Sequence, residues 1–426
     1  MTRKSSNKRQ KHIIIGNSAA ALNAIAAIRN NVSNWPITLI SAEKHYAYSP
    51  VLLTYYLSKK ISREETFLVG QDFYNDHEVD LVLGNRATKV DPDKQIVYLA
   101  DGKKIGYDNL LIATGSSPKR LGIKNENLEE IFTLKSIDDA DKILKKSADM
   151  KEIVIVGGGL IGLQAANSLF SKDRKITMVI GSKQPLSQNI DPPCAESVCR
   201  SVKECGISLL FETNVVSIER IKNKLKIELN SGKTLDADSI IVGKGVTPNI
   251  QLVRESGIDV NRGIIVDETM RTNISNVFAA GDVAEGTNFI TEKKQIIATW
   301  PNACLQGKTA GINMAGGKSK FYSLNSNICS FLGKTVASVG ITKPDNMNFE
   351  ENTFTNPGKG LYRKIVWNKK DEIIGALLME KVEDIGVITN MIKNRVKIPR
   401  ELRNCMVRST VKYGDFFSRK TGCFLW

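Results

Sequence analysis

The chain begins with an apolar strand pattern, a turn of small residues and an apolar helical stretch. Isoleucine dominates residues 11–15, residues 16–21 are mostly small, and a stretch rich in Ala and Ile continues to Asn30. β-Branched runs favour strands, and residues 37–41 predict the next one. The order of strand, tight turn and helix is typical of a dinucleotide-binding unit.

A second stretch repeats this order more clearly. Residues 153–156 predict a buried strand, and a glycine-rich turn follows at residues 157–162. An apolar helical pattern then runs through Phe170, and residues 175–180 predict another strand. Alternation of strands and helices of this length predicts parallel sheets with helices on both faces.

The two turns differ in how well they match the glycine positions of such a unit. The first glycine permits the sharp turn, the second lets the backbone approach a pyrophosphate, and the third allows close packing of helix on strand. The second turn has all three, at Gly157, Gly159 and Gly162. The first has Gly16, followed by Ser18 and Ala21 at the other two positions. Two such units predict two dinucleotide sites in one chain.

The residues that follow the second strand of each unit bear on the adenosine ribose. A carboxylate there accepts hydrogen bonds from the ribose hydroxyls of NAD, whereas a 2′-phosphate favours positive charge. Glu43 is the candidate in the first unit. The second unit has Ser182 and Lys183 instead, which favours NADPH or use of both NADH and NADPH. An exposed turn that contacts no ligand is the alternative.

Composition fits a globular protein of more than one domain. The 426 residues are 42% hydrophobic and 25% charged, which excludes wholesale disorder. A chain of this length exceeds one ordinary core, so we expect two or three domains. Seven cysteines without zinc-type spacing and three histidines, all within the first 77 residues, predict no metal site and no disulfide scaffold.

The net charge of +15 is concentrated at the two ends of the chain. Residues 1–12 contain five Lys and Arg and no acid, and residues 387–426 contain nine against Glu401 and Asp415. Such clusters indicate an acidic partner, an anionic surface or a solubilising tail.

Targeting signals give little support for a membrane protein. No run of 18 apolar residues is present, so no transmembrane segment is predicted. The basic start followed by residues 13–28 imitates a secretory signal peptide, but its cleavage would destroy the first glycine turn. We therefore expect a cytoplasmic protein.

Three further motifs occur in the order found in a known superfamily. Residues 110–115 form a strand that ends in Ala-Thr-Gly, residues 243–249 contain a Gly-Val-Thr-Pro-Asn turn, and residues 277–282 form an apolar strand that ends in Gly-Asp. With the two glycine turns, this set resembles the pyridine nucleotide-disulfide oxidoreductase superfamily. The resemblance implies an α/β fold with two Rossmann-like, doubly wound domains, one for FAD and one for NADH or NADPH, plus a smaller C-terminal α+β domain.

The resemblance also implies domain boundaries. The FAD domain would be discontinuous and the NAD(P) domain inserted into it, with a basic tail before them. The implied segments are residues 1–11 for the tail, 12–118 and 247–318 for FAD, 119–246 for NAD(P), and 319–426 for a C-terminal interface domain.

Within the superfamily, two groups are more similar than the rest. Residues 37–69, 300–316 and parts of the C-terminal region resemble the reductase module of assimilatory nitrite reductases. The chain also resembles the epsilon subunit of phenylglyoxylate dehydrogenase, an NADH:acceptor module, which suggests a functional analogue.

A redox disulfide is the feature of the superfamily that this sequence lacks. Residues 40–70 contain no cysteine, and Ser49 and Pro50 occupy the place of the reactive cysteine. The C-terminal histidine base is also missing, since residues 78–426 contain no histidine. Cys194 and Cys199 have the five-residue spacing of a redox pair but follow Pro192 and Pro193, in the nicotinamide half, and are expected to be buried apolar residues.

The resemblance without the disulfide implies a simple reaction. NAD(P)H would pass hydride to FAD, and electrons would leave for an external acceptor, without a catalytic side chain. Because the chain has no cluster-type cysteine spacing, an acidic iron–sulfur protein or subunit is the expected acceptor. Homodimerisation or membership of a larger redox complex is compatible with this reading. The alternatives are an NAD(P)H oxidase that reduces oxygen and a protein similar to apoptosis-inducing factor that binds nucleic acid through its basic surface; nucleic acid is the less favoured partner.

The resemblance and the glycine turns together give a set of candidate cofactor residues. For FAD they are Gly16, Ser18, Ala19, Ala20, Glu43, Pro50, Thr54, Ala87, Ala113, Thr114, Gly115, Asp282 and Trp300. For NAD(P) they are Gly157, Gly159, Leu160, Ile161, Gly162, Ser182, Lys183 and Gly245.

Overall fold

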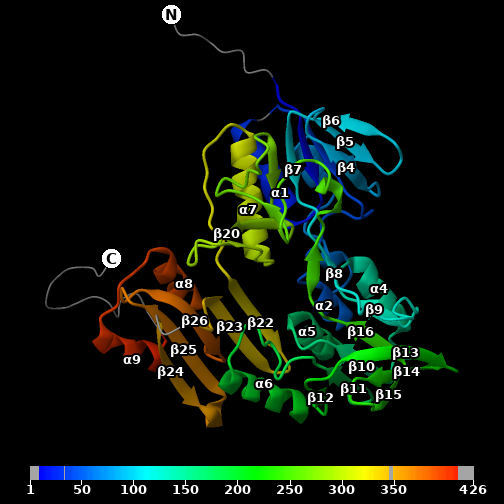
Figure 1. Cartoon of the computed structure of the whole chain (residues 1–426), viewed down its shortest axis with the longest axis vertical. Coiled ribbons are helices and arrows are strands. Elements are labelled where there is room, and N and C mark those ends of the chain that lie inside the picture. The colour runs from blue at the N-terminus through cyan, green and yellow to red at the C-terminus, as the bar shows by residue number, and fades with distance from the viewer. Residues whose placement is uncertain (1–8, 33, 345–348, 411–426) are drawn as a thin grey trace, which may run out of the picture. The chain divides into compact units, whose positions relative to one another are not determined.

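The computed structural model describes residues 9–32, 34–344 and 349–410 (Figure 1). It divides into two compact units, each assembled from several segments of the chain. Unit 1 consists of residues 1–52, 61–117 and 246–324, and unit 2 of residues 53–60, 118–245 and 325–426. The basic ends at residues 1–8 and 411–426 lie outside the described residues.

A five-stranded parallel sheet forms the centre of unit 1. Its strand order is β19-β7-β1-β2-β3, and every neighbouring pair is parallel. The strands are β1 (His12–Ile15), β2 (Ile37–Ile40), β3 (Val79–Val82), β7 (Asn109–Ile112) and β19 (Val277–Ala279). Strands β1, β2 and β19 are buried at every position, as expected for a parallel sheet covered on both faces.

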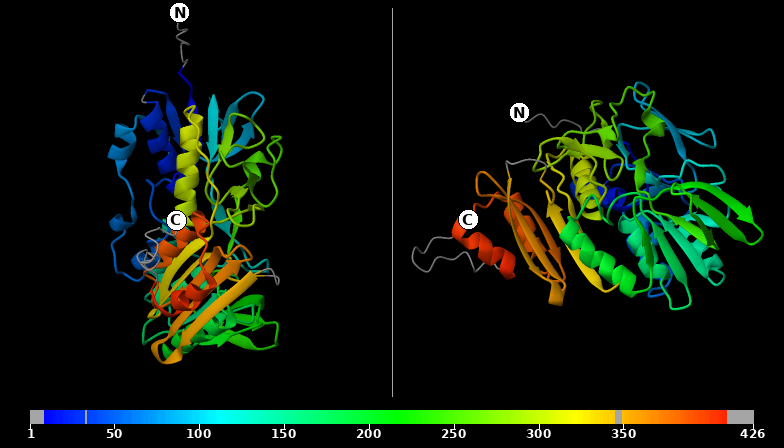
Figure 2. Two further views of the ribbon diagram at one scale, coloured as in Figure 1. Left: turned by 90° about the vertical axis from the view of Figure 1, so that its left-hand side faces the viewer. Right: turned by 60° about the horizontal axis from the view of Figure 1, so that its bottom comes forward.

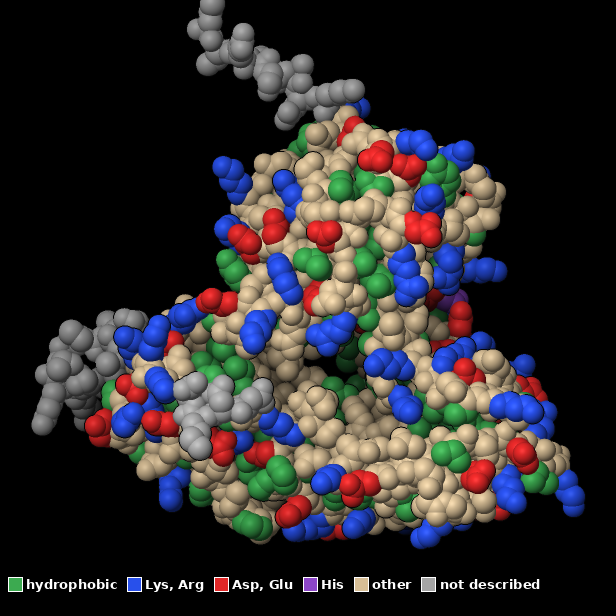
Figure 3. All heavy atoms as spheres, in the orientation of Figure 1, with side chains coloured by type: hydrophobic (Ala, Val, Ile, Leu, Met, Phe, Trp, Pro, Cys, Tyr) green, Lys and Arg blue, Asp and Glu red, His purple; other side chains and the backbone are tan. Residues whose placement is uncertain are grey.

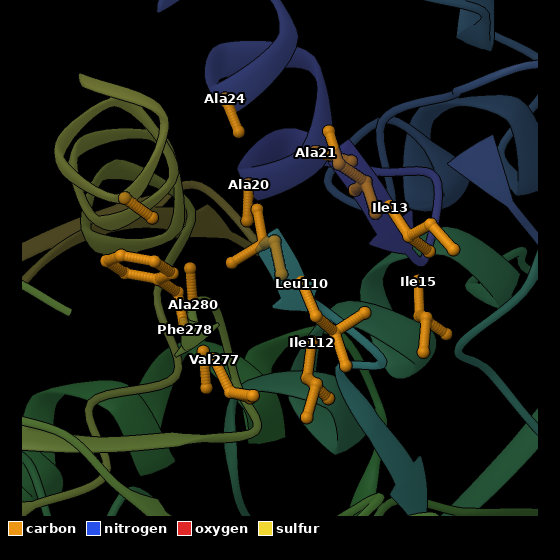
Figure 4. Packing of buried hydrophobic residues seen from close by; sticks show 14 of the residues in the cluster. Ile13, Ile15, Ala20, Ala21, Ala24, Leu110, Ile112, Val277, Phe278 and Ala280 are labelled. Atoms are coloured by element: carbon orange, nitrogen blue, oxygen red, sulfur yellow. The ribbon is translucent and has the colours of Figure 1, made fainter. Parts of the chain in front are cut away.

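Two helices of unit 1, far apart in the sequence, lie side by side: α1 (Ala19–Asn31) and α7 (Trp300–Met314) (Figures 1 and 2). Glycines of α7 make this close approach possible. A Cβ added at Gly307 would lie 2.1 Å from the carbonyl oxygen of Ala20, and one at Gly311 would lie 2.5 Å from that of Ala24. Figure 4 shows Ala20 and Ala24 directed into the core that β7 and β19 share.

Smaller elements complete unit 1. An antiparallel sheet contains β4 (Ala87–Asp91), β5 (Ile96–Leu99) and β6 (Lys104–Gly106), and a second small sheet contains β18 (Ile264–Ile265), β20 (Ala284–Thr287) and β21 (Lys294–Gln295). Its short helices are α3 (Gln71–Asp76) and the 3₁₀ turns Glu64–Thr66 and Gln251–Val253. Strands β8 (Ser116–Pro118) and β17 (Val246–Pro248) pair where the chain passes between the units.

Unit 2 contains a second parallel sheet, with strand order β12-β11-β10-β16-β9. Its strands are β9 (Ile131–Thr133), β10 (Glu152–Val156), β11 (Lys175–Val179), β12 (Ser208–Leu210) and β16 (Ser239–Val242). The helices near it are α2 (Leu53–Leu57), α4 (Ile137–Lys146), α5 (Leu160–Leu169) and α6 (Pro192–Glu204). An antiparallel sheet is added by β13 (Val215–Ile221), β14 (Lys224–Leu229) and β15 (Thr234–Ala237).

An antiparallel sheet of order β22-β23-β26-β25-β24 forms the C-terminal part of unit 2. Its strands are β22 (Ser326–Phe331), β23 (Lys334–Gly340), β24 (Phe349–Asn356), β25 (Leu361–Asn368) and β26 (Ile373–Met379). A 3₁₀ turn spans Pro357–Lys359, and helices α8 (Ile385–Lys393) and α9 (Arg400–Arg408) pack on one face of this sheet (Figure 2). None of the helices in the described ranges combines the length and hydrophobicity needed to cross a membrane.

The predicted fold class is confirmed, with two parallel Rossmann-like sheets and a smaller C-terminal α+β region. The predicted helix ends at Asn30 and Phe170 lie within one residue of the ends of α1 and α5. The division into units differs from the predicted domains in two places. Residues 53–60 pack with unit 2, and the C-terminal sheet shares a unit with residues 118–245. The assignment of FAD, NAD(P) and interface roles to these segments stays a prediction.

Candidate functional site

The first glycine turn lies at the carboxyl end of β1, where the sheet of unit 1 reverses its strand order. Gly16 has a φ of +114°, and a Cβ there would lie 2.1 Å from the carbonyl oxygen of Ala113. Only glycine therefore fits between the ends of β1 and β7. Ligands of open parallel sheets bind at the carboxyl edge at such a reversal.

The helix that follows this turn presents its N-terminus at the same edge. Ser18 is the N-cap residue of α1, and its side chain makes no capping hydrogen bond. The first N–H groups of a helix have no partner within the helix, and its dipole favours anions there. The backbone at Ala19 and Ala20 is therefore suited to a pyrophosphate, as predicted for this turn.

Strands β7 and β19 bring further predicted residues to this edge. Ile15, Ile112 and Ala279 are aligned across β1, β7 and β19, so the residues after them emerge side by side. The Ser116 hydroxyl donates to the Asp282 carboxylate at 2.7 Å. This bond orients a half-buried carboxylate that is suited to polar groups of a cofactor chain.

The backbone around Thr114 and Gly115 is fixed by Asn249. The Asn249 side-chain amide donates to the carbonyl oxygen of Thr114 at 2.9 Å, and its backbone N–H donates to that of Gly115 at 3.0 Å. The Thr114 hydroxyl donates in return to the backbone carbonyl of Asn249 at 2.9 Å. Asn249 belongs to the Thr-Pro-Asn turn that the sequence singled out, but its partner was not predictable from spacing.

Helix α7 also supports this edge. The N–H of Gly281, which has a φ of +84°, donates to the side-chain oxygen of Gln306 at 2.8 Å. Gln306 is 1% exposed and donates in turn to the Ser323 hydroxyl at 3.2 Å. Trp300 is the first residue of α7 and is half-buried.

Glu43 lies three residues beyond the end of β2 and is exposed. The Tyr48 hydroxyl donates to its carboxylate at 2.6 Å, which holds one oxygen in place. Pro50 follows at a half-buried position, and Ala87 begins β4. Glu43 lies in unit 1 with the first turn, and contact of Glu43, Pro50 or Ala87 with a cofactor stays a prediction.

Sequence reasoning missed a buried tyrosine behind the first turn. Tyr74 is fully buried, and its hydroxyl donates to the Asn17 side chain at 2.8 Å and accepts from the N–H of Ala47 at 3.1 Å. Burial raises the pKa of Tyr74, so the hydroxyl stays protonated and keeps its donor role. No motif contains Tyr74, because it lies 57 residues from Asn17.

The second glycine turn, in unit 2, repeats the geometry of the first. Gly157 has a φ of +122°, and a Cβ there would lie 2.4 Å from the carbonyl oxygen of Gly243. A Cβ at Gly162 would lie 2.1 Å from the carbonyl oxygen of Gly157. Gly159 is the N-cap of α5, and no heavy atom lies within 4 Å of its added Cβ position. The space over Gly159 is therefore open to a phosphate group.

The residues after β11 present no carboxylate. The Ser182 hydroxyl donates to the carbonyl oxygen of Gln184 at 2.7 Å, and Lys183 is exposed. Leu160 and Ile161 begin α5, where the side chain of Ile161 is 38% exposed. Gly245 has a φ of +88° and is the last residue of the 118–245 segment of unit 2. The preference between NADH and NADPH stays a prediction.

The structure does not group Thr54 with the other predicted FAD residues. It lies in α2, within unit 2, and its carbonyl oxygen accepts from the Ser168 hydroxyl at 2.9 Å. The nearby Tyr56 hydroxyl donates to Asp141 of α4 at 2.8 Å. Its role beside FAD stays a prediction.

The six cysteines within the described chain are all free thiols. Burial raises the pKa of Cys194, Cys199 and Cys304 above the ordinary thiol value. Cys194 is fully buried, with its sulfur 4.0 Å from that of Met379. Burial thus favours the protonated, poorly nucleophilic form of these three thiols.

Both turns fit the pyrophosphate of a dinucleotide. Each combines a positive-φ glycine packed against the backbone after a neighbouring strand with a helix N-terminus that no N-cap side chain bonds, since Ser18 makes no capping bond and Gly159 has no side chain. Unit 1 also carries the carboxylates of Asp282 and Glu43, each held by a hydroxyl, and their contact with a flavin dinucleotide stays a prediction. The geometry alone therefore supports two dinucleotide sites, one in each unit.

Comparisons with known proteins agree with this architecture. The family model for pyridine nucleotide-disulphide oxidoreductases matches residues 10–307. The epsilon subunit of the NADH-dependent phenylglyoxylate dehydrogenase from Aromatoleum evansii is 32% identical, and the match covers 95% of this chain and 96% of that subunit.

Two further relatives are similar over most of their length. An NADH oxidase from Methanocaldococcus jannaschii is 31% identical, with 78% of this chain and 76% of that protein covered. The ferredoxin–NAD(+) reductase component of the 3-phenylpropionate/cinnamic acid dioxygenase from Photorhabdus laumondii is also 31% identical, over 72% of this chain and 78% of that component. The chain therefore belongs to the pyridine nucleotide-disulphide oxidoreductase family and is an FAD-dependent oxidoreductase that uses NAD(P)H.

Proposed function

We propose that this protein oxidises NAD(P)H through FAD and passes the electrons to a separate iron–sulfur protein or subunit, without a thiol relay. The observation that carries this proposal is the presence of two glycine turns, each followed by an open helix N-terminus, in a chain whose residues 40–70 contain no cysteine. Bound FAD would accept hydride and release electrons, which is chemistry that the cofactor itself supplies.

The protein's own residues bind and orient in this proposal. The helix N-termini at Ser18 and Gly159 would hold the two pyrophosphates. Asp282, oriented by Ser116, would accept hydrogen bonds from the hydroxyl groups of the flavin chain. Glu43, held by Tyr48, would bind the adenosine ribose. None of these roles requires a proton transfer from a side chain.

The described thiols support transfer without a disulfide. Cys304 lies in α7, the helix that supports Gly281 through Gln306, and burial raises its pKa. A thiol relay needs a thiolate at neutral pH. Cys194 and Cys199 belong to α6 of unit 2 and have raised pKa values as well.

Two relatives support a protein acceptor. One is named as a subunit of a larger NADH-dependent dehydrogenase and matches nearly this whole chain. The other is named as a ferredoxin–NAD(+) reductase component, and ferredoxins carry iron–sulfur clusters. These names favour an iron–sulfur acceptor over a small-molecule disulfide.

The visible surface of the described residues carries charges of both signs. Figure 3 shows Lys and Arg interspersed with Asp and Glu over the faces turned to the viewer. Residues 1–8 and 411–426, which lie outside the described residues, carry a net charge of +5 out of the total of +15. An acidic partner therefore stays a prediction from the sequence.

A rate comparison tests the proposed acceptor. Purified protein is supplied with NADH, then with NADPH, and reduction of an added ferredoxin is followed without oxygen, whereas oxygen consumption is measured in air without ferredoxin. We expect ferredoxin reduction to be several times faster than oxygen consumption. Oxygen consumption that matches or exceeds ferredoxin reduction would contradict the proposal.

That contrary result would favour the second candidate function, an NAD(P)H oxidase. The observation in its favour is the similarity to the NADH oxidase from Methanocaldococcus jannaschii. The two candidates share the donor and FAD and differ only in the acceptor, so the rate comparison separates them directly.

A further inference from the structure

The segment that follows β11 is held in an unusual backbone conformation. It comprises residues 182–191 and includes Ser182 and Lys183, which would approach the adenosine end of NAD(P)H. Leu186, at its centre, has a φ of +49° and is 3% exposed. A leucine keeps a left-handed backbone only where surrounding contacts hold it there.

One set of these contacts ties the 182–191 segment to the glycine turn. The N–H of Leu186 donates to the carbonyl oxygen of Gly158 at 2.8 Å. The side chain of Gln184 donates to the carbonyl oxygen of Ile190 at 2.9 Å, which closes the segment on itself. A shift of the segment would therefore pull directly on the turn that we propose for the pyrophosphate.

A second set ties the segment to the C-terminal part of unit 2. The Thr342 hydroxyl donates to the carbonyl oxygen of Asn189 at 2.9 Å. The Lys343 ammonium donates to the carbonyl oxygen of Ser187 at 2.5 Å. Both donors lie just beyond the end of β23.

The segment ends at a buried carboxylate held by β25. Asp191 is 8% exposed and is the N-cap residue of α6. Its Oδ2 accepts hydrogen bonds from the Tyr362 hydroxyl and, at 3.2 Å, from the Lys364 ammonium. Among the described residues its Oδ1 has no hydrogen-bond partner. A buried carboxylate is tolerated only with such partners, so Asp191 is fixed by the C-terminal sheet.

The opposite face of β25 carries a similar arrangement that does not touch the segment. Arg363 donates to both oxygens of Asp384, at 3.1 and 2.6 Å, and Asp384 is the N-cap residue of α8. Asp191 and Asp384 are thus two buried N-cap carboxylates, each paired with a buried cation of the same strand. Only Asp191 is continuous with the 182–191 segment.

We infer that Asp191 is a positioning residue for NAD(P)H. Through its bonds to Asp191, the C-terminal sheet holds the 182–191 segment, and with it the glycine turn, in the conformation that binds the nucleotide. The inference rests on the proposed NAD(P)H site at Gly157–Gly162 and deepens it. If loss of the Asp191 carboxylate leaves the segment in its binding form about one tenth of the time, the apparent dissociation constant rises about tenfold.

The test compares Asp191→Asn with the matched control Asp384→Asn. Binding of ADP-ribose and of its 2′-phosphate is measured by calorimetry, and kcat and KM for NAD(P)H are measured with ferricyanide as acceptor. We expect Asp191→Asn to raise the dissociation constant of the preferred probe and the KM by about tenfold, with kcat close to the wild-type value. Asp384→Asn should change neither quantity, because the Asp384 carboxylate accepts from Arg363 of β25, which also donates to the Met406 carbonyl oxygen of α9, and no bond of this pair reaches the segment.

A milder variant covers the case in which Asp191→Asn does not fold. Thr342→Val removes only the hydrogen bond to Asn189, and we expect a smaller rise in the same two constants, with FAD content unchanged. Unaltered binding in Thr342→Val and Asp191→Asn, or an equal loss in Asp384→Asn, would overturn the inference while leaving the proposed site intact. A wild-type protein that binds neither probe would overturn the site itself.

Discussion

At the scale of single residues, the two turns are specified by what a side chain would collide with. The positions of Gly16, Gly157 and Gly162 leave less than 2.5 Å between an added Cβ and a backbone carbonyl oxygen. The strand–turn–helix pattern around these glycines is local and repeats in both units, which is why the sequence alone predicted both turns, although the oxygens next to Gly16 and Gly157 belong to the distant Ala113 and Gly243. The adjacent Ser18 and Gly159 fit for a different reason, since each leaves a helix N-terminus open.

Replacing Gly162 by alanine should impair NAD(P)H binding specifically. The new methyl group would need to displace the backbone of Gly157, from which it would lie 2.1 Å. We expect the KM for NAD(P)H to rise by about tenfold or more, equivalent to at least about 1.4 kcal/mol of binding, while FAD stays bound. Steady-state kinetics and the visible flavin spectrum provide the two readouts.

The control is Gly386→Ala in α8, where nothing lies within 4 Å of the added Cβ. Alanine favours the helix over glycine by up to about 1 kcal/mol, so this variant should be as active as the wild type and no less stable. Equal KM values for the Gly162→Ala variant and the wild type would show that the turn does not bind the nucleotide.

His12 should make the stability of the protein depend on pH. Burial, followed by the charge of Arg29, lowers the pKa of His12 from 6.5 to about 4. Between pH 6.5 and 4 the imidazole of His12 is protonated in the unfolded chain but neutral in the folded protein. The contribution of His12 to the free energy of unfolding is therefore fully present above pH 6.5 and decreases as the pH falls toward 4. The shift corresponds to a loss of about 3 kcal/mol across that window.

Urea unfolding at pH values between 4 and 7.5 measures this loss, and His12→Phe is the comparison. Phenylalanine preserves a ring against Trp35, on which His12 stacks with centroids 5.2 Å apart. The free energy of unfolding should decline less steeply with acid in the variant. The same decline in both proteins would assign the effect to other groups.

At the scale of elements, the packing of α1 on α7 joins the first and the last chain segments of unit 1, residues 1–52 and 246–324. Gly307 and Gly311 lie one turn apart on α7 and receive Ala20 and Ala24 of α1. The same α7 fixes Gly281, next to Asp282, through Gln306. Close contact of the helices therefore supports the proposed FAD edge as well as the core.

Substitution of Gly307 by alanine should weaken FAD binding through this contact. Its Cβ would lie 2.1 Å from the backbone of Ala20, so α7 has to move outward. Overpacking of this kind costs about 1–3 kcal/mol. Thermal unfolding should shift downward and the purified protein should contain less flavin.

Lys308→Ala, at an exposed position of the same helix, is the matched control and should stay within about 0.5 kcal/mol of wild-type stability. Wild-type flavin content and thermal stability in Gly307→Ala would contradict the role given to the α1–α7 contact.

Contacts between distant elements could not be predicted from the sequence, whereas the elements themselves could. The strand–turn–helix units were predictable because their pattern is contained in about 30 consecutive residues. The hydrogen bond between Tyr74 and Asn17 spans 57 residues, and that between Tyr362 and Asp191 spans 171. These residues become hydrogen-bond partners only when the fold brings them together, so no local spacing in the sequence indicates them. The grouping of residues 53–60 with unit 2 likewise depends on distant contacts, such as Ser168 with Thr54.

At the scale of the whole molecule, each unit carries one dinucleotide turn at the carboxyl edge of its own parallel sheet. The C-terminal sheet belongs to unit 2, where it contacts the 182–191 segment through Asp191, Thr342 and Lys343. We therefore propose that this sheet, which the sequence suggested as an interface domain, also shapes the nucleotide site. The order of the motifs was predictable from the sequence, whereas this contact was not.

The number of electrons that the protein accepts tests the central claim most directly. Under anaerobic conditions the purified protein is titrated with NADH or NADPH, and bleaching of the flavin absorbance is followed to its endpoint. Transfer without a thiol relay predicts one equivalent of donor, or two electrons, per FAD, before and after treatment with a thiol-alkylating reagent. Uptake of a second equivalent that alkylation abolishes would reveal a redox disulfide and contradict the account.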